Sequence, residues 1–380
     1  MLVIHQSELK TETINQRQAM KRFIILTVVS CFWIGSFGIN GATIGSTASA
    51  QDRSMFVSDA SFIVGTYEPA ESDYLPATAA ARANALLALL DEEAKGKISH
   101  AIDSDERRAW TNLPAKPNAG GIRMGDMNEA QVKAVCDLLA TLVSESGYQK
   151  FIHVMLADDQ LLKNGRARRG FGTENFSIVI FGTPAEDEPW SVQLDGHHVG
   201  LNVALSGDQL TISPSFIGTQ PADFDLGGEP IRPLAGESDD AYALVNLLDK
   251  QQRIAAVVGD RRRDLEAGPG RDNKIPEAVG VDCSTFNEAQ RAKLTELISH
   301  WVSDLPPAHA EKRMAQLTEE IDQMKFSWNG AVEAGSDISY RLQGPTVIIE
   351  YACQSLGGNP LQHLHTMYRN PQNEYGGQIK

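Results

Sequence analysis

Apolar residues recur at helical spacing in the first part of the chain. Within 132–143 they stand three or four positions apart, which places them on one face of a helix. The run 126–129 is typical of a helix start, and Gly147 offers an end. Two neighbouring stretches are also expected to be helical, the Ala- and Leu-rich 77–94 and the run 151–162. The sequence therefore predicts helices from 76 to 163.

The pattern changes after residue 175. Short apolar runs are separated by Gly, Pro and Asp, as the turns of an antiparallel meander require. The runs are 176–181, 190–194, 199–205 and 209–213. Gly207 and Asp208 stand between the last two runs, where we expect a hairpin turn.

The helical period returns after residue 238, and strands return near the C-terminus. The expected helices are 239–258, 287–302 and 309–324, and the expected strands are 326–328, 338–342, 346–351 and 363–368. The intervening run 259–278 is rich in Arg, Asp, Gly and Pro and predicts a solvated loop. Its three consecutive arginines, 261–263, are interleaved with acids, which favours a wet surface over an anion site.

Helices and strands are grouped along the chain and do not alternate strictly. This grouping favours an α+β fold over a doubly wound parallel sheet. We expect a helical N-terminal half, with antiparallel strands in the centre and at the C-terminus and helices between them. No segment recurs at a fixed period. Residues 76–380 are expected to form a single large α+β domain.

Residues 1–50 have the order of features found in a secretory signal peptide. Lys21 and Arg22 form a positive stretch, 23–34 is almost wholly apolar, and small residues end in 48–50. The alternative is a membrane anchor, but the apolar run is short for a bilayer span and is followed by Gly and Ser. The sequence therefore predicts a cleaved leader.

Cleavage is expected before Gln51, and translation starts at Met1 or, with a better signal, at Met20. Residues 51–75 are expected to be poorly ordered. The predicted location is exported, either periplasmic or extracellular, with no membrane contact beyond the cleaved leader.

Charge and cysteine content exclude several classes of partner and of site. Lys+Arg 34 against Asp+Glu 49 gives a net charge of −15, which argues against nucleic acid as a partner, because a phosphate backbone needs clustered positive charge. A small-molecule substrate is the expected partner. Cys136, Cys283 and Cys353 follow the leader without a C-x-x-C pair, so neither a disulfide scaffold nor a thiol-redox centre is predicted.

Histidines gather in two short motifs at predicted strand edges. In His363-Leu364-His365, strand alternation puts both imidazoles on one face, where they can ligate a metal ion. In Asp195-Gly196-His197-His198, Asp-Gly predicts a turn, and alternation allows only one histidine to join a given site; we choose His198. Hydrogen-bonded or surface histidines are the alternative for both motifs.

Three charged residues near the C-terminus are further candidates. Glu350 ends a run that is apolar on both faces, so its carboxylate needs a partner. That partner is either Arg341, in a buried ion pair, or a metal or substrate proton. Arg369 falls on the same face as the histidine pair if the strand continues. In contrast, Asp158 and Asp159 are expected to lie on a solvated face or helix end.

Several motifs resemble those of one family, in the family's order. They are 188–198 with Leu201-Asn202, 326–330, Tyr340-Arg341 with Gly344-Pro345, Ile349-Glu350, 363–371, and 373–376. From about Arg108 to the C-terminus the chain is similar to domain-of-unknown-function family 3500, although Glu374 stands where the family usually has Asp. The resemblance implies an often exported bacterial or fungal protein, without a stated activity. Trp190, Gln193 and Arg341 lie in these motifs and are candidate substrate-binding residues.

The resulting hypothesis is an exported metal-dependent hydrolase. His198, His363 and His365 would bind a divalent metal, zinc or else copper, and leave a position for an activated water. The catalytic candidates have separate roles: Glu350 as fourth ligand or base, Arg369 as the clamp for an anionic substrate group, and His197 with Asp195 as proton carrier or orienting pair.

Two alternatives remain open from the sequence. One is an enzyme without metal that uses the histidines as acid and base on an anionic small molecule. The other is a periplasmic metal- or ligand-binding protein without turnover.

Overall fold

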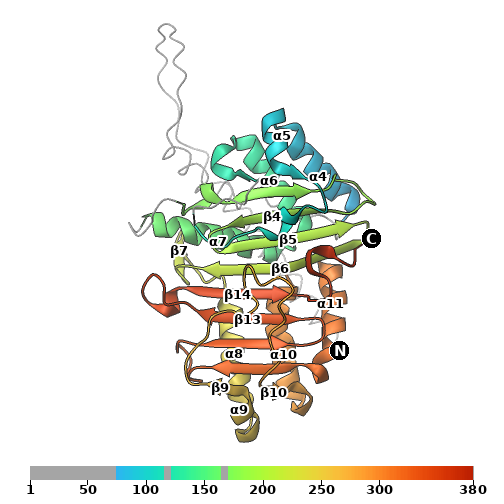
Figure 1. Ribbon diagram of the computed structural model, residues 1–380. Helices are drawn as coiled ribbons and strands as arrows, with labels where there is room; N and C mark the ends of the chain where they lie inside the picture. The colour runs from blue at the N-terminus through green and yellow to red at the C-terminus, as the bar shows by residue number, and fades with distance from the viewer. Residues whose placement is uncertain (1–73, 115–120, 164–169, 380) are drawn as a thin grey trace, which may run out of the picture. The chain divides into compact units, whose positions relative to one another are not determined.

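The computed structural model describes residues 74–114, 121–163 and 170–379, all within one compact unit of the chain (Figure 1). The expected leader, 1–50, lies outside the described residues, as does 51–73 of the segment expected to be poorly ordered. None of the described helices is both long and apolar enough to cross a lipid bilayer.

A mixed sheet of 12 strands runs through this unit. The strands are β1 (Ser99–His100), β2 (Ile122–Arg123), β3 (Ser177–Phe181), β4 (Trp190–Gly196), β5 (Val199–Ser206), β6 (Gln209–Thr219), β9 (Val257–Gly259), β10 (Val281–Asp282), β11 (Lys325–Asn329), β12 (Ser339–Gln343), β13 (Ile348–Cys353) and β14 (Leu364–Arg369). The order is β1-β3-β4-β5-β6-β14-β13-β12-β11-β10, with β2 beside β3 and β9 beside β11. Strands β7 (Phe224–Leu226) and β8 (Glu229–Ile231) form a separate ribbon.

The described helices precede each set of long strands. They are α4 (Pro76–Ala88), α5 (Glu92–Ile98), α6 (Glu129–Leu142), α7 (Glu145–Lys163), α8 (Ala235–Leu247), α9 (Lys250–Ala256), α10 (Glu288–Val302) and α11 (Pro307–Glu320). This arrangement confirms the α+β prediction. The one helix expected over 239–258 is two helices, because the Asp249 side chain accepts hydrogen bonds from the backbone N–H groups of Gln251 and Gln252 and starts α9 anew.

The described chain folds as two halves with the same order of elements. The first half runs α4, α5, β1, β2, α6, α7 and β3 to β6, and the second runs α8, α9, β9, β10, α10, α11 and β11 to β14. The last strands of the halves, β6 and β14, pair antiparallel, so the two meanders continue as one sheet (Figure 1). The sequence shows no fixed period because corresponding loops differ in length.

Helix caps repeat in detail between the halves. Asn128 caps α6 in a capping box with Gln131, and Asn287 caps α10 in a capping box with Gln290. Gln131 Nε2 also donates to Leu89 O, at the end of α4, at 2.9 Å. Gln290 Nε2 donates in the same way to Leu247 O, at the end of α8, at 2.9 Å. The duplication therefore extends to single hydrogen bonds.

Strand pairing repeats as well. The pairs β1/β3 and β9/β11 are parallel, whereas the long neighbouring strands are antiparallel. A glycine with positive φ ends each first long strand, Gly182 at 82° and Gly330 at 103°. Their backbone N–H groups donate to His100 O at 2.8 Å and Gly259 O at 3.0 Å. Glycine adopts this backbone conformation without a Cβ clash, which explains its use at both positions.

The two faces of the sheet differ in chemistry. One face carries a row of aromatic residues, in which Tyr340 stacks between Trp328 and Tyr351 at ring-centroid distances of 6.1 and 5.2 Å. This face belongs to the main hydrophobic core, together with buried residues of all the long helices. Tyr340 Oη donates to Glu237 O of α8, a helix that lies behind the sheet in Figure 1.

The opposite face is largely polar. Strand register places eight residues in one row across it, Ser327, Arg341, Glu350, Met367, Phe216, Gly200, Asp195 and Ser177. Among the described residues, the separate apolar cluster on this side is small and consists of Trp110, Phe216, Met367 and Tyr375. Irregular segments cover it: the described parts of 101–121, 260–280 and the C-terminal 370–379. The solvated loop expected at 259–278 is thus partly buried, with Ala267 fully inaccessible.

The duplicated caps give a stability prediction. Replacing Gln290 or Gln131 with Ala leaves a helix-end carbonyl without its side-chain donor. Gln290 is buried, whereas Gln131 is partly exposed to water that replaces the lost bond. We expect Gln290→Ala to lower the free energy of unfolding by about 2 kcal/mol and Gln131→Ala by about 1 kcal/mol or less. Urea unfolding of both variants measures this, and an equal or reversed order would contradict it.

Candidate metal centre

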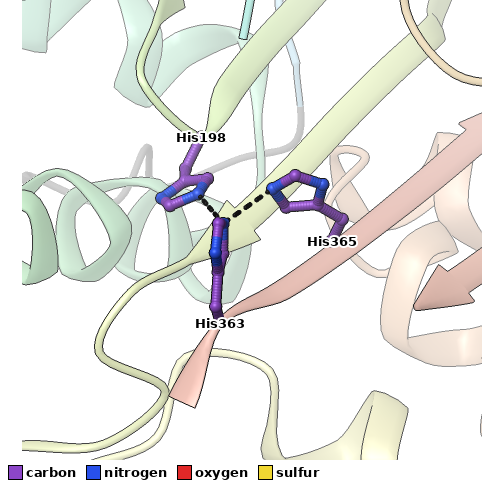
Figure 2. Close-up of side chains that lie close together, drawn as sticks. All are labelled: His198, His363 and His365. Carbon is purple, nitrogen blue, oxygen red and sulfur yellow. Dashed lines mark hydrogen bonds between the residues drawn. The ribbon is translucent and has the colours of Figure 1, made fainter. Parts of the chain in front are cut away.

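Three imidazoles point at a common spot (Figure 2). His198 lies in the β4–β5 turn, His363 directly precedes β14, and His365 lies within β14. The Nε2 atoms of His198 and His363 are 2.8 Å apart, and those of His363 and His365 are 3.0 Å apart. The structure therefore brings together the three histidines that the sequence hypothesis proposed as ligands, and their potential ligand atoms all lie within 4.8 Å of one another.

Strand β6 joins the two segments that carry these rings. Its Ile217 pairs with Val199, directly after the β4–β5 turn, and its Gly218 pairs with His365. The turn and the start of β14 consequently lie at the same edge of the sheet, one on each side of β6. Residues far apart in sequence meet because the two halves of the fold pair through β6 and β14.

Two backbone features make room for the rings. A Cβ on Gly218 would lie 2.7 Å from His198 Cδ2 and 3.0 Å from His365 Cδ2, so only glycine leaves space there. His198 has φ 71°, a left-handed conformation that costs a non-glycine residue about 1–3 kcal/mol. Two backbone bonds hold it, from His198 N to Asn112 O and from Gly218 N to His198 O.

Burial and neighbouring groups keep these histidines neutral. The pKa values of His198 and His365 are well below the usual value, first because burial penalises the charged ring and then because the other histidines are close. Burial also lowers the pKa of His363. Its Nδ1–H donates to Leu356 O at 2.6 Å, which leaves a lone pair on Nε2, facing the other two rings.

This donor set fits a transition metal. Three neutral imidazoles with converging nitrogens are a common zinc ligand set, and a carbonyl partner that fixes the ring tautomer is typical of metal-binding histidines. Zinc–nitrogen bonds of about 2.0–2.1 Å place tetrahedral ligand atoms about 3.3 Å apart. The observed separations of 2.8 and 3.0 Å would need to widen by only a few tenths of an ångström.

A second group adjoins the triad. The His197 ring lies 3.6 Å from the His198 ring, measured between centroids, and its Nδ1 is 2.5 Å from Asp158 Oδ1. Asp158 is only 1% exposed and also accepts a hydrogen bond from Gly172 N at 2.6 Å. The Phe171 ring packs edge-on against His197. A buried carboxylate thus orients an imidazole beside the candidate metal ligands.

The expectation that Asp158 and Asp159 are solvated is wrong. Both lie on the buried side of α7, and Asp159 accepts hydrogen bonds from Thr173 N at 2.9 Å and from Thr173 Oγ1. Burial raises the pKa of Asp159 to about 6. A signal was present in the sequence, because the acid pair interrupts an otherwise apolar helix face between Leu156 and Leu161.

Glu350 and Arg341 meet each other on the polar face and not the histidines. They are cross-strand neighbours whose Nη1 and Oε1 atoms are 3.4 Å apart, which is the buried ion pair left open as an alternative. Glu350 also accepts from Glu266 N at 3.2 Å and Ala267 N at 2.8 Å, while Arg341 donates to Glu277 O at 2.7 Å. Both side chains hold the covering segment 260–280.

Arg369 belongs to the same network. Its Nη1 donates to Ala267 O and Arg271 O, each at 3.0 Å, and its Nε pairs with Glu374. Asp272 lies 3.4 Å from its Nη2. Arg369 is 2% exposed, and protein acceptors surround its guanidinium. Binding the anionic group of a substrate there would require displacing one of these acceptors.

The remaining candidates also contact covering segments or the core. Gln193 Nε2 donates to Arg107 O at 2.9 Å and to Asn202 Oδ1. Asp195 accepts from Thr111 N at 3.1 Å and from Ser177 Oγ at 2.8 Å. Trp190 is fully buried in the main core. All three side chains therefore contact other groups of the protein. Asp158, and not the expected Asp195, is the acid that contacts His197 Nδ1.

Cys136, Cys283 and Cys353 are free and buried.

A family model described as "Protein of unknown function (DUF3500)" matches residues 75–377. No curated protein and no solved structure matches the chain. Since the match spans most of the sequence, the chain belongs to this family, as its motifs indicated.

The buried Asp159 gives a pH-dependent stability prediction. Its pKa in the folded state, about 6, exceeds the ordinary 3.8, so the folded protein binds the proton more tightly than the unfolded chain. This stabilisation is complete below pH 3.8 and is lost as the pH rises through 6. Asp159→Asn cannot lose a proton. We expect its free energy of unfolding, relative to wild type, to increase by about 2–3 kcal/mol between pH 4 and pH 7.

Urea unfolding at several pH values measures this difference, and Asp103→Asn, at an exposed position, is the matched control. A difference between Asp159→Asn and wild type that stays constant with pH would contradict the prediction.

Proposed function

We propose that His198, His363 and His365 bind one divalent metal ion, zinc in the first place, and that this family member is an exported metal-dependent hydrolase of a small molecule. The convergence of three neutral Nε2 atoms, two pairs of them 2.8 and 3.0 Å apart, carries the proposal. The composition of the leader supports export.

When bound by three imidazoles, zinc supplies a strongly polarising cation that makes water a nucleophile near neutral pH. The chain's own residues determine where this chemistry can occur. His363 is fixed by Leu356 O, and His198 is fixed by its turn backbone, so the ligand atoms are in place before any metal arrives. Preorganised ligands of this kind reduce the cost of binding.

Asp158 and His197 have the second role in this proposal. Because Asp158 contacts Nδ1, the other ring nitrogen of His197 is the atom at which a proton can be held or moved. Glu350, Arg341 and Arg369 have no part in the proposed mechanism, since their polar atoms hold the segments that cover the sheet.

Metal content tests this proposal directly. The purified mature protein is incubated with zinc, freed of excess metal and analysed for its elements; one zinc per chain is expected. Removing a residue that hydrogen-bonds to a metal ligand typically lowers metal affinity by about 10- to 100-fold, and removing a ligand itself lowers it further. His198→Ala and His363→Ala should therefore weaken zinc binding by about 100-fold or more. His300→Gln, elsewhere in the fold, and Glu350→Gln should retain the metal.

Failure of the wild-type protein to bind zinc or copper would exclude the metal centre. Competition between the two metals identifies the preferred one, because three imidazoles suit both and copper binds such sites more tightly in general.

The Asp158–His197 pair would also serve the metal-free alternative, in which histidine acts as acid and base. A chelator separates the two. Once a substrate is found in a hydrolase panel, the metal mechanism predicts that activity is lost after chelation and returns on adding zinc. Asp158→Asn should lower kcat by about 100-fold while the zinc content is retained. Activity that a chelator leaves unchanged would support the metal-free enzyme instead.

A further inference from the structure

A cleft lies where the duplication repeats the surroundings of the histidines. The histidine centre is built from the β4–β5 turn, the start of β14 and helix α7. The corresponding elements of the other half are the β12–β13 turn, the start of β6 and helix α11. These elements line a cleft of about 370 Å³; its lining includes Thr346 from the turn, Ile212 from β6 and Arg313 from α11.

The chemistry of this cleft differs from that of the histidine centre. Among the described residues, the groups able to hold a metal contain none of its lining residues. Two neighbouring cations of α11, Lys312 and Arg313, line it instead, with Asp208 as the acid. Within the described ranges, neither cation takes part in an ion pair. A concentration of unpaired positive charge is unusual in a chain with a net charge of −15.

Arg313 is held in place by hydrogen bonds and not by a direct ion pair. Its residue exposure is 9%. The guanidinium donates to Tyr368 Oη at 2.8 Å, to Gln316 Oε1 at 2.8 Å and to both oxygens of Thr346. All of these direct acceptors are uncharged, and the carboxylate of Glu320 joins the network one bond further out, where it accepts from Thr346 Oγ1 at 2.7 Å and from Gln316 Nε2 at 3.0 Å. A largely buried cation whose direct partners are all neutral gains from the approach of an anion, and the cleft gives an anion access.

The other polar side chains of the cleft can form hydrogen bonds with the hydroxyl groups of a ligand. The amide side chains of Gln209, Asn370 and Gln378 line the same cleft, and each amide can both donate and accept. The volume of about 370 Å³ falls within the usual range for small-molecule sites. We propose that this cleft binds a small hydroxylated carboxylate, such as a sugar acid, with its carboxylate toward Lys312 and Arg313. The proposal rests on the duplication and the cleft chemistry, and does not depend on the metal centre.

Calorimetric titration of the full mature protein with D-glucuronate tests this site, with D-glucose as the neutral probe of similar size. Glucuronate should bind saturably, and glucose should not. Lys312 is exposed, so Lys312→Gln preserves the fold. We expect it to weaken glucuronate binding by about fivefold, the loss of one charge-assisted contact. Lys325→Gln removes the same charge outside the cleft and should leave binding unchanged.

His363→Ala separates this site from the metal centre, because it should abolish zinc binding and retain glucuronate binding. Absence of saturable glucuronate binding would overturn the proposal, and so would equal weakening by Lys312→Gln and Lys325→Gln. Binding of inorganic phosphate without glucuronate would also overturn it, since the amide lining would then serve no hydroxylated ligand.

Discussion

Irregular backbone packed against a β-sheet must find partners for its N–H and C=O groups, and in this fold one face of the sheet supplies them. Gln193, Arg341 and Arg369 donate to carbonyls of the covering segments, while Asp195 and Glu350 accept from their N–H groups. The face is polar for this reason. A helix layer would satisfy its own backbone and would require an apolar face, as on the opposite side, where the main core lies.

This constraint explains which predictions from sequence succeed. Periodicity records burial and pairing, so the helices, the meanders and the α+β class could be predicted. The histidine pair could be placed on one face by alternation. A polar residue in a buried strand, however, has the same appearance whether it binds a substrate or a loop backbone. Glu350 and Arg369 were attractive catalytic candidates, yet their atoms contact residues 266–272 and the C-terminal segment, whose positions no local pattern reveals.

The duplication was hidden for a related physical reason. A hydrophobic core requires apolar residues of suitable volume, not particular ones, so core positions diverge freely. Positions with strict geometry retain their identity: the Asn-Glu-Ala-Gln run recurs at 128–131 and 287–290, where a capping box is formed. The cross-strand pair Gln193–Asn202 corresponds to Arg341–Glu350, so the partnership persists while its chemistry changes from neutral to charged.

The proposed metal centre and the proposed anion cleft differ in backbone conformation and in the space available, as well as in their side chains. In the β4–β5 turn His198 adopts φ 71°, whereas Thr346 in the β12–β13 turn is not among the described residues with positive φ. A β-branched residue would be strained in that conformation. Near the end of β6, Gly218 admits two imidazoles. The position that corresponds to it by strand register is Pro371, which follows the end of β14. The proposed metal centre uses both the left-handed turn and the missing Cβ. The second half has neither, so its cleft retains the position of the site and is lined by cations and amides instead of imidazoles.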